Sequence, residues 1–392
     1  MKEKVIYLDS HASTPVDQDV LNEMLPFFTL NYGNGNHKAG WKSAAAMEMA
    51  RNQVSDLIGA RPSEIIFTSG ATEAINLALL GLANANNTNR KHIVTQRTEH
   101  AAVLQCLDSL QEKDYRVTIL DVDDVGRIDL NELKSVVDNE TLVVAIMLAN
   151  NEIGTVQPIE EIGKICHTLG AKFFCDLTQG IGWHAIHVDK MNIDLAAMSA
   201  HKIYGPRGVG ALFLRRHNSK TTLSPILFGG GQERGIRPGT ANIPGIVGFG
   251  KACEIYRSNS DKIYNKVRKL RDRLQEYIFN SIEDVRLNGC ETNRHPGNLN
   301  ISIPGITGED LIGALPNIIL STSSACASGS AKPSHVISAL GVNEEILNGV
   351  FRFGINKFNT TDEIDYVGER IVYRAKYLLK KRMLHYDHVI DN

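Results

Sequence analysis

Residues 65–78 read IIFTSGATEAINLA, and this stretch decides the fold class. The β-branched and aromatic residues at 65–68 predict a buried strand, and the apolar spacing that follows predicts a helix beginning near Ala71 and Thr72. Gly70 lets a ligand approach the backbone closely. The free N–H groups of the first helical turn, together with the Thr72 hydroxyl, can form an anion site. An ordinary strand-to-helix turn would have the same pattern, so this segment alone leaves both interpretations open.

The alternation of strand and helix patterns continues over about residues 60–215. Longer helical patterns separate short β-branched or apolar runs, which include HIVTQ (92–96), RVTILDV (116–122), TLVVAIMLA (141–149) and GVGALFLRR (208–216). Strands that recur with intervening helices favour a mostly parallel sheet that is covered on both faces. The sequence therefore predicts an α/β fold for this region.

A second region begins with a long amphipathic helix that we predict near residues 259–281. Its apolar residues recur at three- and four-residue steps, at Ile263, Val267, Leu270, Leu274 and Ile278. Beyond this boundary helix, short strand and helix patterns alternate, as in NLNISIP (298–304) and HVISALG (335–341). Such a mixture is typical of a smaller α+β domain.

The composition is that of an enzyme-sized globular chain. Its 392 residues exceed what one hydrophobic core usually organises. A formal net charge of −2 provides no electrostatic footprint for nucleic acid, so we expect small-molecule or protein partners and no direct binding of nucleic acid. No apolar run approaches the roughly 18 residues that span a bilayer, and the first ten residues lack the apolar core of a signal peptide. We therefore expect a cytoplasmic protein without membrane contact.

The six cysteines are scattered, with no Cys-x-x-Cys pair and no clustered histidines, so the sequence predicts neither a disulfide framework nor a metal site. Most of these thiols should be small buried hydrophobic groups. Cys326 differs because nine of the twelve residues at 321–332 are Ser, Ala or Gly, which are too small to build a core. A loop of this kind is often functional. A flexible surface connection with an incidental cysteine is the alternative.

Two further segments place polar groups after apolar strands. AKFFCDLTQG (171–180) ends a strand in Asp176, with Gln179 three residues later. Strand-end carboxylates in open α/β sheets often face the ligand crevice, although a solvated loop aspartate would give the same pattern. LAAMSAHKIYGPRGVGALF (195–213) places Lys202 between a strand and a Gly/Pro-rich turn.

A lysine in a partly desolvated pocket loses proton affinity and can form a Schiff base, whereas a typical lysine points into water. A phosphate site, the strand-end Asp176 and the flanked Lys202, in this chain order, are the parts that pyridoxal phosphate requires. The combination therefore favours the interpretation that the three features form the site of a pyridoxal-phosphate enzyme over the interpretation that they are unrelated.

Two other residues have two interpretations each. Arg352 lies in the strand-like GVFRFGINKF (349–358), where its guanidinium could hold a substrate carboxylate through two parallel hydrogen bonds or form a surface ion pair. His100 lies where a strand changes into a helix, so it could stack on an aromatic cofactor or cap the helix.

Read together, these motifs resemble the pyridoxal-phosphate-dependent cysteine desulfurases of the NifS/IscS type. The resemblance runs from about Tyr7 to the helix near residue 370. The matching segments occur in the family's order: YLDSHASTPVD (7–17), FTSGATEAINLA (67–78), EHAAVL (99–104), NNEIGTVQPI (150–159), DLTQ (176–179), SAHKIYGPRGVGAL (199–212), GGGQERGIRPGTANIPGIVGFGKA (229–252) and SSACASGSAKPSHVISALG (323–341).

The resemblance implies a fold-type I architecture, pyridoxal 5'-phosphate as cofactor, and a homodimer. The expected large domain, residues 15–258, holds the cofactor on a mostly parallel seven-stranded sheet. The expected small α+β domain consists of residues 1–14 and 259–392 and carries a catalytic-cysteine loop at about 321–332.

The resemblance also assigns the cofactor-binding residues. Lys202 matches the lysine that binds the cofactor covalently, Asp176 the partner of the pyridinium nitrogen, Gln179 the partner of the ring hydroxyl, and His100 the residue that stacks on the ring. The positions that match the phosphate site are Ala71, Thr72, Ser199, His201 and, reaching the neighbouring subunit, Thr240.

For the substrate, Asn151 and Arg352 match the residues that hold its carboxylate, and Cys326 matches the nucleophile. We therefore expect a cysteine desulfurase that converts L-cysteine to L-alanine and leaves a persulfide on Cys326, since the thiolate is the attacking form. The sulfur would pass to an acceptor protein in iron–sulfur cluster assembly, tRNA or DNA thiolation, or cofactor synthesis. Small side chains would let the loop of Cys326 swing between the cofactor and the surface.

Alternative functions are a related enzyme of the same fold, such as a selenocysteine lyase, a C–S lyase or a small-substrate aminotransferase, and a non-catalytic scaffold protein. Cys326 argues against the first group, because those reactions need no nucleophilic thiol. The presence of Lys202 and Asp176 argues against the scaffold.

Overall fold

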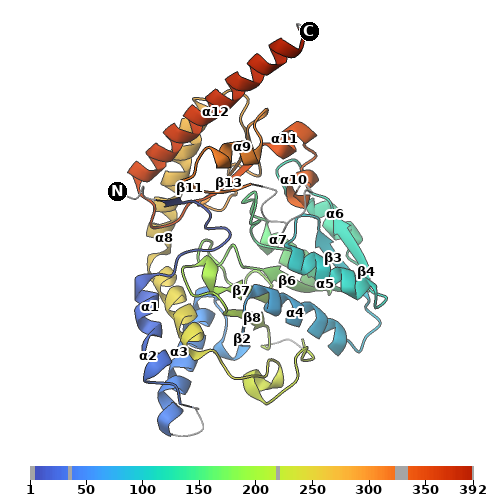
Figure 1. Cartoon of the computed structure of the whole chain (residues 1–392). Helices are drawn as coiled ribbons and strands as arrows, with labels where there is room; N and C mark the ends of the chain where they lie inside the picture. The colour runs from blue at the N-terminus through green and yellow to red at the C-terminus, as the bar shows by residue number, and fades with distance from the viewer. Residues whose placement is uncertain (1–4, 34–37, 218–220, 323–333, 391–392) are drawn as a thin grey trace.

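The computed structural model describes residues 5–33, 38–217, 221–322 and 334–390. Figure 1 shows a large sheet with helices on both sides. The C-terminal segments and the long helix α12 (Thr361–Ile390) lie beyond one end of this sheet.

Seven strands form the large sheet in the order β2-β8-β7-β6-β5-β3-β4. All of them are parallel except β8, which is antiparallel to both of its neighbours. The strands are β2 (Ile65–Thr68), β3 (His92–Gln96), β4 (Arg116–Leu120), β5 (Thr141–Ala145), β6 (Lys172–Asp176), β7 (Leu195–Ser199) and β8 (Gly210–Leu214). The prediction of an α/β fold with a mostly parallel seven-stranded sheet is thus confirmed.

Alternate residues of each strand enter different cores, because successive side chains of a strand point to opposite faces. Phe173 packs in one core, and its neighbour Phe174 packs in the other. Helices α4 (Ala71–Ala85) and α5 (Ala101–Gln111) cover the face of Phe174. The opposite face is covered by α3 (Trp41–Ile58), α6 (Leu130–Val136), α7 (Ile159–Thr168) and part of α8 (Ile243–Phe279).

The carboxyl ends of the parallel strands meet at one edge of the sheet. Strand β6 ends at Asp176, and β7 ends at Ser199 and leads directly into the 3-10 helix η3 (Ala200–Lys202). Helix α4 begins at the same edge, two residues after β2. The polar residues predicted at strand ends are therefore brought to one place.

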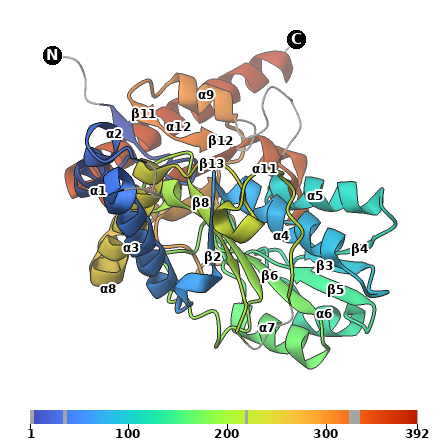
Figure 2. The same ribbon diagram turned by 90° about the horizontal axis from the view of Figure 1, so that it is seen from below.

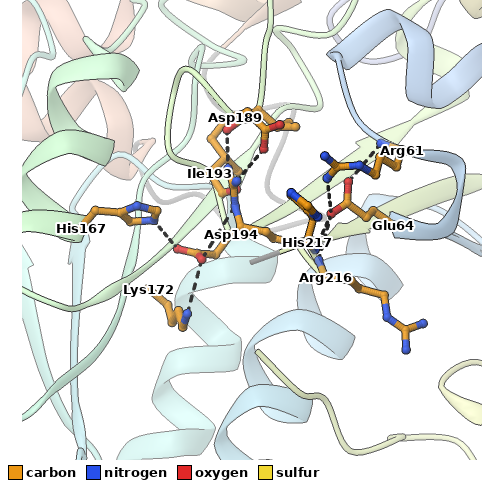
Figure 3. Close-up of polar contacts among 11 residues, drawn as sticks. Arg61, Glu64, His167, Lys172, Asp189, Ile193, Asp194, Arg216 and His217 are labelled. Carbon is orange, nitrogen blue, oxygen red and sulfur yellow. Dashed lines mark hydrogen bonds and ion pairs between the residues drawn. The ribbon is translucent and has the colours of Figure 1, made fainter. Parts of the chain in front are cut away.

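At the opposite edge of the sheet, two buried carboxylates hold the connecting loops (Figure 3). Asp194 accepts hydrogen bonds from the backbone N–H of Phe173 and from Nε2 of His167, both at 2.9 Å. Glu64 accepts a hydrogen bond of 2.9 Å from the backbone N–H of Arg216. The contacts of Asp194 join the start of β7 to the start of β6 and to α7, and the contact of Glu64 joins the start of β2 to the end of β8.

Helix α8 begins earlier than predicted, at Ile243 rather than near residue 259. Its first half contains glycines, which by sequence alone favour a loop, but which here allow a close approach to α3. A Cβ at Gly250 would lie 2.6 Å from the Cα of Ala50. The second half of α8 packs against α12, so one helix links the two regions of the molecule (Figure 1). In the described ranges, no helix combines the length and apolar character needed to cross a membrane.

The C-terminal region contains a small antiparallel sheet in the order β12-β13-β10-β9, together with a parallel pair, β1 and β11. The strands are β1 (Ile6–Tyr7), β9 (Arg286–Leu287), β10 (Asn298–Ser302), β11 (Ile318–Ile319), β12 (Ser321–Thr322) and β13 (Val350–Gly354). The remaining α-helices of the described residues are α1 (Gln18–Met24), α2 (Pro26–Thr29), α9 (Gly308–Gly313), α10 (His335–Ala339) and α11 (Glu344–Asn348). The division at residues 14/15 and 258/259 stays a prediction, which the pairing of β1 with β11 supports.

Candidate active site

A cavity of about 840 Å³ opens at the edge where the parallel strands end. Its walls come from the large sheet, from the N-terminal segment and from the small sheet. It is lined by these residues that the sequence singled out: Ala71, Thr72, His100, Asn151, Asp176, Gln179, Ser199, His201, Lys202 and Arg352. The structure therefore brings together side chains from most of the length of the chain.

One side of the cavity is suited to an anion. The first N–H groups of α4 have no acceptor within the helix, and a Cβ at Gly70 would meet nothing within 4 Å, so the backbone is open there. Nδ1 of His201 lies 3.2 Å from the Ser13 hydroxyl, to which Arg207 Nε donates at 3.0 Å. Burial, together with the positive charges of Lys202 and Arg207, lowers the pKa of His201 to about 4. His201 can therefore act as a neutral donor while Arg207 supplies positive charge.

Asp176 forms the floor of the cavity at the end of β6. It is buried, and its Oδ1 accepts a hydrogen bond of 2.9 Å from the backbone N–H of Thr178. Within the described ranges, no cationic side chain lies at ion-pairing distance from Asp176. A buried carboxylate is stable only with a suitable partner, and a cationic ring N–H group would provide one.

Lys202 follows β7 and meets the N-terminal segment. Its Nζ donates hydrogen bonds to the backbone carbonyls of His11 and Ala12, the latter at 3.0 Å. Gln179 Nε2 donates to the same His11 carbonyl at 3.0 Å. The N-terminal segment thus positions two of the predicted cofactor-binding side chains.

His100 is the N-cap of α5 and also lines the cavity. Its Nδ1 accepts a hydrogen bond of 3.1 Å from the backbone N–H of Ala102, and its side chain is exposed to the cavity. The two interpretations of this residue are therefore compatible, because capping fixes the ring at the cavity wall.

Arg352 of β13 is buried in a polar cluster rather than exposed in a surface ion pair. Its NH2 group donates to Asp9 Oδ1 at 2.8 Å and to Ser321 Oγ at 3.1 Å, and NH1 donates to the Asn151 carbonyl at 3.2 Å. Asp9, Asn151 and Ser321 all line the cavity with Arg352. This wall can bind a carboxylate beside the Asp176 floor.

Comparison with known proteins identifies the family. The model of the class-V aminotransferases matches residues 6–367. The chain belongs to this family. It is 44% identical to "Cysteine desulfurase IscS" of Anaeromyxobacter sp. (strain Fw109-5), over 95% of this chain and 93% of that protein.

Solved structures of class-V aminotransferase relatives agree with this assignment. A "NifS-like protein" superposes with a TM-score of 0.89 and 36% identity, covering 95% of this chain and 100% of that one. The structure "SspA in complex with cysteine" has a TM-score of 0.79 and 32% identity, with 91% of this chain and 100% of that one covered.

Cysteine desulfurases of the class-V aminotransferase family depend on pyridoxal phosphate, and so does this enzyme. The described residues fit the group. Ala71 and Thr72, in the first turn of α4, line the cavity, Asp176 offers a buried carboxylate, and the Thr178 hydroxyl is buried without a hydrogen-bond partner among the described residues. These are the groups that a phosphate and a protonated pyridine ring would satisfy.

One predicted residue of this class-V aminotransferase lies outside the cavity. Thr240 lines a second cavity of about 410 Å³, which shares Ser69 and Gly208 with the first. Cys326 lies outside the described residues. The other five cysteines are buried and free, as predicted for most of the thiols.

Asp9, His11 and Arg207 are among the cavity residues for which the sequence predicted no role. Asp9 and His11 lie in YLDSHASTPVD (7–17), a segment that indicates the family but predicts no separate role for these two side chains. A signal was available, since that segment places a carboxylate and an imidazole two residues apart.

Proposed function

We propose that this enzyme is a cysteine desulfurase that converts L-cysteine to L-alanine and takes the sulfur onto Cys326. One observation carries the proposal: a single cavity is lined by Lys202, the buried Asp176 and the buried guanidinium of Arg352. The relation to IscS and to a protein solved with cysteine supports the choice of substrate.

In this proposal, the residues have separate tasks. Arg352 and Asn151 orient the substrate carboxylate, and His100 stacks on the cofactor ring. Lys202 Nζ removes the proton from the substrate Cα, while Asp176 keeps the ring nitrogen protonated. Pyridoxal phosphate, when bound, supplies an electron sink for the carbanion that results.

The sulfur transfer itself belongs to Cys326. Its thiolate attacks the sulfur of the substrate, so that an S–S bond forms as the Cβ–S bond breaks. The electron pair of the broken bond stays on Cβ, which takes up a proton and becomes the methyl group of alanine. The products are alanine and a persulfide on Cys326.

We also propose a homodimer in which Thr240 contributes to the phosphate site of the neighbouring subunit. Leu227 and Phe228, in the segment that leads to Thr240, are large apolar side chains, and Phe228 is 90% exposed. A side chain of this kind is suited to burial against a second copy. The sulfur-acceptor protein, the cytoplasmic location and the absence of direct nucleic-acid binding stay predictions from the sequence.

The test is to incubate the purified holoenzyme with L-cysteine and to measure alanine and protein-bound persulfide. We expect alanine from the unaltered enzyme and an added sulfur atom on the peptide that contains Cys326. The variant Lys202→Ala should lose the visible absorbance band of the covalently bound cofactor. Its rate of alanine formation should fall at least about 100-fold. Lys269→Ala, a change of an exposed lysine on α8, is the matched control and should leave both unchanged.

The variant Cys326→Ala separates this function from its main alternative. Loss of alanine formation supports the persulfide mechanism. Undiminished alanine formation with release of free sulfide would instead identify a C–S lyase or selenocysteine lyase.

A further inference from the structure

His11 is a buried side chain of the active-site wall. It is 3% exposed and lies in the N-terminal segment, 168 residues before Gln179. Nδ1 of its ring is 3.2 Å from Gln179 Oε1, and its backbone carbonyl accepts a hydrogen bond of 3.0 Å from Gln179 Nε2. Both ends of the Gln179 amide therefore contact the same residue.

These two contacts determine how the amide is oriented. A backbone carbonyl can only accept, so the end of the Gln179 amide that faces the His11 carbonyl must be the NH2 group. The amide oxygen then faces the imidazole, and His11 must donate from Nδ1. The flipped amide would place its oxygen against the oxygen of the His11 carbonyl, which excludes it. One N–H of Gln179 Nε2 is left for a partner in the cavity.

The surroundings of His11 keep its ring neutral. Burial lowers the pKa of His11 to about 3, and the positive charges of Arg352 and Lys202 lower it as well. The other ring that it contacts, His295, lies edge-on with the centroids 4.7 Å apart, and burial holds the pKa of His295 well below its ordinary value. His11 therefore keeps a single ring proton throughout the neutral pH range.

We propose that His11 is a positioning residue that directs the N–H group of Gln179 toward the hydroxyl oxygen of bound pyridoxal phosphate. This inference rests on the proposed function and gives His11 a task that the family resemblance does not assign. A hydrogen-bond donor stabilises the hydroxyl oxygen in its anionic form. It thereby lowers the affinity of this oxygen for a neighbouring proton. When the donor is lost, that proton should leave only at higher pH.

The test compares His11→Asn with His11→Leu in the cofactor-loaded enzyme. Asparagine can place an N–H group near the position of Nδ1, whereas leucine, of comparable size, cannot donate. Both changes remove the ring contact with His295, and only His11→Asn keeps a hydrogen-bond donor at this position. The measurement is the pH midpoint of the visible absorbance change of the bound cofactor, without substrate.

We expect His11→Asn to keep the midpoint of the unaltered enzyme and His11→Leu to raise it by about one pH unit, as for loss of a hydrogen bond to a charged oxygen. Gln179→Leu should raise the midpoint by a similar amount. A His11→Leu midpoint equal to that of the unaltered enzyme would overturn the proposal, as would equal shifts in both His11 variants.

Failure of this inference can be told apart from failure of the proposed function. If the unaltered protein binds no cofactor with visible absorbance, the proposed function itself is wrong. If Gln179→Leu shifts the midpoint and His11→Leu does not, only the role of His11 is wrong. Should His11→Leu not fold, ¹⁵N NMR of the histidines in the unaltered holoenzyme decides. The signal of His11 is the one that is absent from the spectrum of His11→Asn. We expect this signal to show the Nδ1–H tautomer, and an Nε2–H tautomer would refute the inference.

Discussion

Two buried carboxyl groups near the floor of the cavity have different environments. Asp176 faces the cavity, whereas Glu99 is enclosed, and its Oε1 accepts hydrogen bonds from the backbone N–H of Met147 at 2.6 Å and from Gln96 Nε2 at 2.8 Å. Burial raises the pKa of Glu99 to about 8, and the nearby charge of Asp176 raises it too, against the hydrogen bond from Met147. Glu99 is therefore protonated at neutral pH, so that Asp176 has a neutral acid as its neighbour.

This difference predicts a pH-dependent stability. Between about pH 4.5 and pH 8 the unfolded chain releases the proton of Glu99 while the folded chain keeps it, so the free energy of unfolding falls as pH rises through this window. Glu99→Gln cannot titrate and should lack this dependence. The measurement is urea unfolding at pH 5, 6.5 and 8, at equal cofactor loading. The free energy of unfolding of Glu99→Gln should increase relative to that of the unaltered enzyme by about 1 kcal/mol per pH unit. Parallel pH profiles would contradict a protonated Glu99.

At the scale of elements, the start of helix α8 depends on contact rather than on local pattern. The amphipathic spacing near 263–278 identified the second half of the helix correctly, but the glycines at 245, 248 and 250 resemble a loop in sequence. Helix α3 packs directly against this part of α8. This packing compensates for the low helix propensity of the three glycines.

A matched pair of glycine variants tests this close approach. Gly250→Ala would place its Cβ 2.6 Å from the Ala50 Cα, so we expect a loss of about 1–3 kcal/mol in the free energy of unfolding. Gly313→Ala, at the end of α9, meets no atom within 4 Å and should be neutral or slightly stabilising. Chemical denaturation of both variants measures the difference. If Gly250→Ala and Gly313→Ala had equal free energies of unfolding, α3 and α8 could move apart without loss of stability.

At the scale of the whole molecule, the proposed homodimer links assembly to cofactor binding. Phe228→Asp should place a charge at the interface and shift the protein from dimer to monomer in sedimentation velocity. It should also weaken retention of pyridoxal phosphate about tenfold or more, because Thr240 of the neighbouring subunit would no longer reach the phosphate. Tyr373→Asp, a change of a 60% exposed side chain on α12, is the control and should change neither property. If the Phe228→Asp variant is still a dimer, the segment that contains Phe228 is not part of the dimer interface.

Local sequence determined the strands, the helix that follows Gly70 and the strand-end positions of Asp176 and Lys202, because side-chain periodicity and turn residues act over a few positions. Parallel strands bring their carboxyl ends together, so the meeting of these residues could also be predicted. The partners of Gln179 and Arg352 could not. His11 is 168 residues from Gln179, and Asp9 is 343 residues from Arg352. Such pairs leave no periodic signal, and only the tertiary structure, in which the N-terminal segment packs between the two sheets, decides them.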